Sequence, residues 1–167
     1  MEISPGLFFG KLREGDVVSD FDCGNVDTND FLKNDAIDYQ RQNLAVSYVL
    51  KDASNKVLGF VSLAMGAIRT RDHPALVVPN VEIRQYPGLK IGQMGVTRER
   101  QGEKLGEFLV LASIKMAEEL KENIGCRFVL VDAYHERIGF YERLGFKQAK
   151  SKPTGGTMPM YLLISEG

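Results

Sequence analysis

Residues that could take part in chemistry are concentrated in a segment that begins as an apolar strand and continues into a long helix. The strand is predicted over residues 89–96, and the helix follows a loop that contains Gly102 and Gly106. The first turn of a helix has backbone N–H groups without an internal partner, and the helix dipole adds partial positive charge there. Because glycine has no Cβ, this loop predicts a cradle in which the backbone approaches a diphosphate closely. The alternative is an ordinary strand-to-helix connection whose glycines serve turn geometry.

A second cluster lies further along the chain, in and after a short helix predicted over residues 136–144. It has the pattern Phe-Tyr-x-x-x-Gly-Phe, formed by Phe140, Tyr141, Gly145 and Phe146. A buried, β-branched strand over residues 126–133 precedes it. A phenol with a pKa near 10 can protonate a thiolate whose conjugate acid has a pKa near 8.5, which makes Tyr141 the candidate general acid. The alternative is an aromatic side chain that anchors the helix.

Together the two clusters resemble the GNAT family of N-acetyltransferases, which use acetyl-coenzyme A. The pyrophosphate loop of that family reads Arg or Gln, two residues, Gly, one residue, Gly or Ala. Here Gln101 and Gly106 match this pattern, and Lys104 stands where the first glycine is usual. The backbone N–H of Lys104 can still face the diphosphate, and its amine can add a charge-assisted contact. The resemblance covers residues 46–146.

The resemblance implies an α/β (α+β) fold: a single domain over residues 1–167, with a mixed, mostly antiparallel sheet of six or seven strands and helices on both faces. It implies direct transfer of acetyl from acetyl-CoA to a primary amine, with Tyr141 as the catalytic residue. Gly95 would ease the bulge that the family carries in this strand, although a glycine in a strand also marks tight packing. Cofactor contacts, including the oxyanion contacts, are expected from Met94, Gly95, Val96, Gln101, Gly102, Lys104, Leu105 and Gly106.

Three further roles stay open. Family members often place an asparagine seven residues before the tyrosine to hold the pantetheine arm, but Tyr134 stands there, and Asp132 is the alternative. Arg98 and Arg100 are placed to meet the 3′-phosphate of coenzyme A. Three acid–base groups near the expected cleft edges are candidates for the general base, with ordered water as the alternative: His73, Glu82 and His135.

The N-terminal region carries a narrower resemblance. It resembles the start of GNAT toxins of toxin–antitoxin pairs, which acetylate the amine of aminoacyl-tRNA. The residues that carry this resemblance are 21–24, Asn29, 31–32, Ala36, Gln40 and 48–50. A leucine commonly precedes the asparagine in those toxins, and Thr28 takes its place here. Asp27 is predicted to cap the helix that follows, whose apolar face contains Phe31, Leu32, Ala36 and Tyr39.

The acceptor is the least determined part of the prediction. A net charge of −1 excludes a field across the whole molecule that would attract nucleic acid. Six basic residues form a local concentration near the expected cleft: Arg69, Arg71, Arg84, Lys90, Arg98 and Arg100. We therefore place an unspecified amine first and charged tRNA second. A third alternative is a non-catalytic module that binds acyl-CoA or docks a partner, suggested by the departures at Lys104 and Tyr134.

Composition and cysteine content limit the number of domains, the location of the protein and the kinds of bound metal that are expected. The chain has 167 residues, 44% of them hydrophobic and 26% charged, as expected for one globular domain with one core. A signal sequence and an apolar stretch of about 18 residues are both lacking, which predicts a cytoplasmic protein without membrane contact. Cys23 and Cys126 make no disulfide framework, and no spacing resembles a zinc site, so no metal is expected. A homodimer stays open.

The remaining pattern predicts strands, turns and one long connection. Alternating or apolar runs indicate strands over residues 7–12, 45–51, 57–64, 147–150 and 158–164. Residues 52–55 have the turn chemistry of a hairpin. The connection over residues 65–88 is unusually long and contains three prolines, so we expect it to border the acceptor site.

Overall fold

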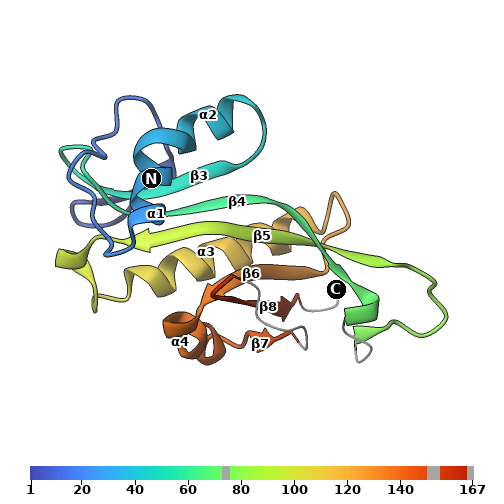
Figure 1. Ribbon diagram of the computed structural model, residues 1–167. Helices are drawn as coiled ribbons and strands as arrows, with labels where there is room; N and C mark the ends of the chain where they lie inside the picture. The colour runs from blue at the N-terminus through green and yellow to red at the C-terminus, as the bar shows by residue number, and fades with distance from the viewer. Residues whose placement is uncertain (73–75, 150–154, 165–167) are drawn as a thin grey trace. The chain divides into compact units, whose positions relative to one another are not determined.

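The computed structural model describes residues 1–72, 76–149 and 155–164. Within them the chain forms eight strands, hydrogen-bonded in the order β1-β2-β3-β4-β5-β6-β8-β7, together with four α-helices (Figure 1). The residues group into two compact units, one made of 1–64 and 92–112 and the other of 65–91 and 113–167. The predicted number of six or seven strands is therefore slightly too low, because β1 is only three residues long and too short to be recognised from the sequence.

The strands of the first unit are antiparallel neighbours along the chain. They are β1 (Glu2–Ser4), β2 (Leu7–Lys11), β3 (Val46–Asp52) and the start of β4 (Val57–Arg69). The predicted hairpin turn between β3 and β4 is confirmed. The carboxylate of Asp52 accepts hydrogen bonds from the backbone N–H groups of Ser54 (2.9 Å) and Lys56 (3.1 Å), and Asn55 adopts a left-handed φ of 63°.

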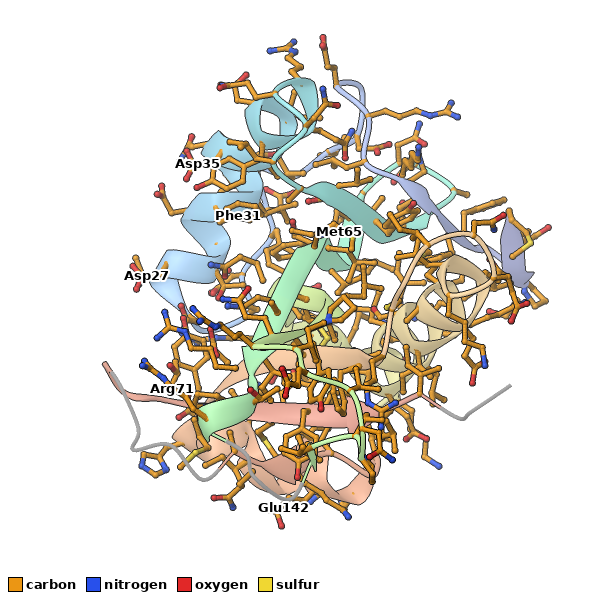
Figure 2. The ribbon with its side chains drawn as sticks, turned by 90° about the vertical axis from the view of Figure 1, so that its right-hand side faces the viewer. Asp27, Phe31, Asp35, Met65, Arg71 and Glu142 are labelled. Carbon is orange, nitrogen blue, oxygen red and sulfur yellow. The ribbon has the colours of Figure 1, made fainter. Side chains whose placement is uncertain are left out.

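The helical segment after β2 is not one regular α-helix. It consists of α1 (Val26–Asp30), a π-helical turn (Phe31–Asp35) and α2 (Ala36–Arg41). A π-helical turn shifts the side chains that follow it around the axis, and Tyr39, predicted on the apolar face, is 42% exposed. In Figure 2, Asp27 and Asp35 mark the solvent side of this segment, while Phe31 is buried.

Helices cover both faces of the sheet in the first unit. Phe60 of β4 contacts the rings of Phe21 and Phe31 on one face, with centroid distances of 5.5 and 6.2 Å. Its neighbour Gly59 points to the other face, where a Cβ would lie 3.4 Å from Leu109 of α3 (Leu105–Leu120). Successive residues of a strand face opposite sides, so the two contacts place helices on each side and confirm the predicted fold class.

The second unit contains the parallel strand pair. β5 (Gln85–Val96) runs parallel to β6 (Phe128–Tyr134), and a parallel pair needs a long crossover, which here contains α3. The remaining elements are α4 (Ile138–Arg143), β7 (Lys147–Gln148) and β8 (Thr157–Leu163). Tyr86, Phe128 and Leu130 form its core.

The long connection predicted over residues 65–88 is shorter than expected. β4 continues to Arg69 and β5 begins at Gln85, because the alternation of exposed and half-buried residues persists through 65–69. The two strand ends are joined by a hydrogen bond from the backbone N–H of Thr70 to the carbonyl of Arg84 (3.0 Å). The connection thus covers residues 70–84 and includes a short 3-10 helix, Thr70–Asp72.

Candidate active site

The end of β5 is packed tightly against the N-terminal loop. A Cβ on Gly95 would lie 3.0 Å from the Sγ of Cys23 and 3.2 Å from the Cγ2 of Thr28. Of the two interpretations of this glycine, close packing therefore has direct support. Its neighbours Met94 and Val96 are half-buried. Whether the backbone N–H groups here form the oxyanion and pantetheine contacts stays a prediction.

The loop after β5 has a left-handed backbone at two positions, Gly102 and Lys104. Gly102 has a φ of 90°, and a Cβ there would meet nothing within 4 Å. Lys104 has a φ of 62°, a left-handed conformation that costs a residue with a Cβ roughly 1–2 kcal/mol. Lysine thus follows the backbone path that glycine adopts freely. The departure from the glycine pattern changes the side chain and keeps the path of the chain.

The N-terminus of α3 can receive an anion. The helical ladder includes a hydrogen bond from Phe108 N to Lys104 O (3.1 Å), so the N–H groups of Leu105, Gly106 and Glu107 precede that donor. Helices usually satisfy such groups with an oxygen from Ser, Thr, Asp or Asn at the residue before the helix. Lys104 carries only donors and cannot do this. The left-handed backbone at Gly102 and Lys104, and a residue before the helix whose side chain cannot cap it, both fit a diphosphate.

Gln101 links the loop to the end of β5 and to the N-terminal loop through hydrogen bonds. Its Nε2 donates to the carbonyls of Val96 (2.9 Å) and Cys23 (3.1 Å), so its amide group is occupied by backbone partners. Arg98 lies 3.7 Å from a carboxylate oxygen of Asp22, and Arg100 pairs with Glu103. The predicted contact of both arginines with a 3′-phosphate stays a prediction, since each side chain has an acidic partner in the structure.

The cap of the first helix is one of the corrections to the sequence analysis. Asn25, and not Asp27, is the N-cap residue of α1, and its Oδ1 accepts from Thr28 N at 3.0 Å. An N-cap side chain must reach the second or third N–H of the helix, and Asn25 is three residues before that donor. Asp27 lies inside the first turn and is exposed.

Tyr141 belongs to the second unit and lies in α4, with 5% of its surface exposed. The rings of Phe140 and Phe146 contact it edge-on, at centroid distances of 5.1 and 5.4 Å. Burial raises the pKa of the Tyr141 phenol well above its usual value, and the nearby Arg137 only partly opposes this. The phenol therefore stays protonated at neutral pH, as a hydrogen-bond donor must.

The other predicted groups of the second unit differ in their surroundings. Asp132 accepts a hydrogen bond from Lys90 Nζ at 2.7 Å, which gives this carboxylate a cationic partner. Tyr134, the last residue of β6, is half-buried. Glu82 and His135 are exposed. The third candidate base, His73, lies outside the described residues.

The described residues form no metal cluster and no membrane-spanning helix. Across residues 1–72, 76–149 and 155–164, no three or more His, Cys, Asp or Glu side chains come together as a metal would require. Over the same ranges, no helix combines the length and the apolar character needed to cross a membrane. Cys126, two residues before β6, is buried, as predicted for a small core residue.

Comparison with known families bears on this strand–loop–helix arrangement. Residues 43–148, more than half of the chain, match the acetyltransferase (GNAT) domain family. The chain belongs to the GNAT family. It is therefore an acetyltransferase, and the predicted membership is confirmed.

Individual relatives of this GNAT chain include toxins. A tRNA-acetylating toxin of Mycobacterium tuberculosis is 27% identical over 144 residues, which cover 86% of each chain. The toxin AtaT in complex with acetyl-methionyl-tRNAfMet superimposes with a TM-score of 0.79 at 20% identity, over 92% of this chain and 93% of AtaT. A mutant AtaT bound to the C-terminus of the antitoxin AtaR and to acetyl-CoA superimposes with a TM-score of 0.77 at 19% identity, over 95% and 94% of the two chains.

The predicted GNAT site residues fall into two groups. Met94, Gly95 and Val96 lie with residues 101–106 on one continuous strand, loop and helix of the first unit. Tyr141 belongs to the second unit. In the sequence, Asp22 and Asn29 stand out only as part of the toxin resemblance, and neither is predicted as a site residue. Their signal is an Asx-type turn around Gly24, where the backbone N–H of Gly24 donates to the Asp22 carboxylate at 2.9 Å.

Proposed function

We propose that this GNAT acetyltransferase transfers the acetyl group of acetyl-CoA to the α-amine of an aminoacyl-tRNA. The observation that supports this acceptor is the similarity to the tRNA-acetylating toxin over 86% of both chains. An alignment of 144 residues is longer than the family match over residues 43–148, so it includes part of the chain outside that match. This reverses the order of acceptors given by the sequence analysis, where an unspecified amine came first.

The donor site is the strand, loop and helix of the first unit. Gly102, Lys104, Leu105 and Gly106 would hold the diphosphate through their backbone N–H groups. The left-handed backbone at Gly102 and Lys104, the free space beside Gly102 and the lack of a capping oxygen on Lys104 support this. Residues 94–96 would contact the pantetheine arm and the thioester carbonyl. Gln101 would act indirectly, because its side chain is bound to backbone carbonyls.

The reaction breaks the C–S bond of the thioester and forms a C–N bond to the acceptor amine. The amine loses a proton to a base, and the sulfur leaves with the bonding electron pair. Tyr141 would donate a hydrogen bond to this sulfur and supply the proton that completes the thiol. Because burial raises the pKa of Tyr141, full proton transfer is further uphill than for a free phenol. Stabilisation of the thiolate by the hydrogen bond is therefore the larger part of this role.

The test uses acetyl-CoA labelled in the acetyl group. The protein is incubated separately with an aminoacyl-tRNA pool, the same tRNA after deacylation, a lysine-bearing protein extract and polyamines. We expect label in the aminoacyl-tRNA alone, released by mild base as acetylated amino acid. Label in protein or polyamines, with none in aminoacyl-tRNA, would overturn the proposed acceptor. Acetyl-CoA binding without transfer to any acceptor would favour the non-catalytic alternative.

A further inference from the structure

The loop before α1 is held together by two side chains that the proposed chemistry does not use. Asn29 Oδ1 accepts from Cys23 N at 2.9 Å, and Asn29 Nδ2 donates to Asp22 Oδ1 at 3.0 Å. The same oxygen of Asp22 accepts from Gly24 N at 2.9 Å. These bonds fold residues 22–24 into a tight turn, with Gly24 in a left-handed conformation at a φ of 91°. We call this pair of side chains the Asp22–Asn29 clamp.

The turn made by the clamp presents its carbonyls to the loop that follows β5. The carbonyl of Asp22 accepts from Arg98 N at 2.8 Å, and the carbonyl of Cys23 accepts from Gln101 Nε2 at 3.1 Å. Gln101 also reaches back to the carbonyl of Val96 at 2.9 Å. The only regular structure in this loop is one 3-10 turn, Arg98–Arg100. Within it, Arg100 N donates to Thr97 O (3.0 Å) and Gln101 N to Arg98 O (3.3 Å), and its start is held by Thr97 N, which donates to Leu58 O at 2.8 Å. From Arg98 to Gln101, its hydrogen-bond partners in the N-terminal loop are the carbonyls of Asp22 and Cys23.

We propose that the Asp22–Asn29 clamp is a positioning element for the acetyl-CoA loop. It fixes the two carbonyls on which the segment from Arg98 to Gln101 rests, and through that segment it places Gly102 and the start of α3. The inference rests on the proposed function in one respect, that residues 102–106 bind the diphosphate. The clamp itself is a property of the free protein.

The contacts of Asp22 and Asn29 lie outside the hydrophobic core. Asp22 is exposed and Asn29 is half-buried, and neither belongs to the apolar cluster around Phe21 and Phe60. Replacing Asn29 by Ala removes two hydrogen bonds without opening a cavity in that cluster. The bonds that are lost hold the turn at residues 22–24. The effect should therefore be confined to this turn and to the loop after β5 that rests on it.

The matched control is Asn34→Ala. Asn34 lies in the same helical segment and also donates to an aspartate, with 2.6 Å between its Nδ2 and Asp30 Oδ1, but it is exposed. In the free protein, Asn29→Ala should raise the hydrogen-exchange rates of amides 97–104 by about tenfold, and Asn34→Ala should leave them unchanged. The Kd for acetyl-CoA, measured by calorimetry, should rise about tenfold in Asn29→Ala alone. The kcat at saturating acetyl-CoA should stay within about threefold of wild type.

Two substitutions at Asp22 separate the effect of its hydrogen bonds from the effect of its charge. Asp22→Asn keeps an oxygen that can accept from Gly24 N and from Asn29, whereas Asp22→Ala loses it. Faster exchange at residues 97–104 is expected in Asp22→Ala and not in Asp22→Asn. If Asn29→Ala lowers Tm and raises exchange throughout the chain, Gln101→Met gives the same test, because it removes the link from the loop side.

The outcomes distinguish the clamp from the proposed function. Unchanged exchange at residues 97–104 in Asn29→Ala, Asp22→Ala and Gln101→Met would overturn the clamp, whatever the protein binds. A wild-type chain that does not bind acetyl-CoA would overturn the donor site, while the exchange measurements on the free protein would still decide whether the clamp positions the loop.

Discussion

Adding one methyl group at Gly95 should distort the end of β5. The new Cβ would lie 3.0 Å from both the Cβ and the Sγ of Cys23 and 3.2 Å from the Cγ2 of Thr28, all shorter than ordinary carbon contacts near 3.5–4.0 Å. Cys23 is itself held through its backbone N–H, which donates to Asn29, so it has little freedom to move away. We expect Gly95→Ala to destabilise the protein by about 1–3 kcal/mol, the usual cost of overpacking.

The matched control is Gly10→Ala in β2. A Cβ at Gly10 would meet nothing within 4 Å, and its φ lies outside the left-handed region. Alanine there should be neutral or should stabilise by up to about 1 kcal/mol, through the unfolded state. Thermal unfolding by circular dichroism measures the contrast. For a chain of this size, Gly95→Ala should lower Tm by roughly 2–10 °C, and Gly10→Ala should not lower it.

A double variant tests the cause. Cys23→Gly removes both of the 3.0 Å contacts, so Gly95→Ala should cost less in that background than in wild type. The two substitutions should show a coupling energy of at least about 0.5 kcal/mol. If Gly95→Ala is as stable as Gly10→Ala, or if its cost is the same with Cys23→Gly, then close packing does not explain this glycine and the reasoning fails.

Three further predictions concern single side chains. Lys104→Gly should raise Tm by roughly 1–3 °C in a thermal melt, because relief of a left-handed φ (about 1–2 kcal/mol) exceeds the extra unfolded-state entropy of glycine; a lower Tm would contradict the strain. Tyr141→Phe should reduce turnover by on the order of 10²-fold in the label-transfer assay with the Kd for acetyl-CoA nearly unchanged, and equal turnover would return this residue to a packing role. Hydrogen bonds from Gly24 N and Asn29 lower the pKa of Asp22 in the folded protein. Ionised Asp22 therefore stabilises the folded state fully above its unfolded-state pKa of 3.8, and this contribution is lost as pH falls through the lower folded-state pKa. Urea midpoints should therefore fall more steeply in wild type than in Asp22→Asn from about pH 5 to pH 3 and stay parallel from about pH 6 to pH 8.

The sequence predicted the central elements of the fold because their signals are local. The strands around the hairpin at residues 52–55, the long helix after Gly102 and the short helix at Tyr141 each have a clear period or a turn of known chemistry. It missed β1, since three residues cannot show an alternation. It also missed the π-helical turn at Phe31–Asp35, because an extra residue within a helical run leaves the composition unchanged while it rotates the face.

The candidate site was predictable where it follows a motif and unpredictable where it depends on contacts distant in sequence. Gln101 was identified from the loop pattern, but its bond to the Cys23 carbonyl joins residues 78 positions apart. Likewise, the reason for Gly95 lies in two residues of the N-terminal loop. No period or spacing encodes such pairings, so the sequence left bulge and close packing as equal alternatives.

The conformation of Lys104 weakens the hypothesis that the protein is a non-catalytic module. That alternative was motivated by two departures from the family pattern, at Lys104 and at Tyr134. The left-handed φ of Lys104 shows that the loop follows the path of a glycine at this position in spite of the side chain. A lysine also lacks the acceptor oxygen that would cap α3 and compete with a diphosphate. The first departure therefore leaves the proposed diphosphate site usable. The non-catalytic alternative then rests on Tyr134 alone, which stands where family members often have the asparagine that holds the pantetheine arm.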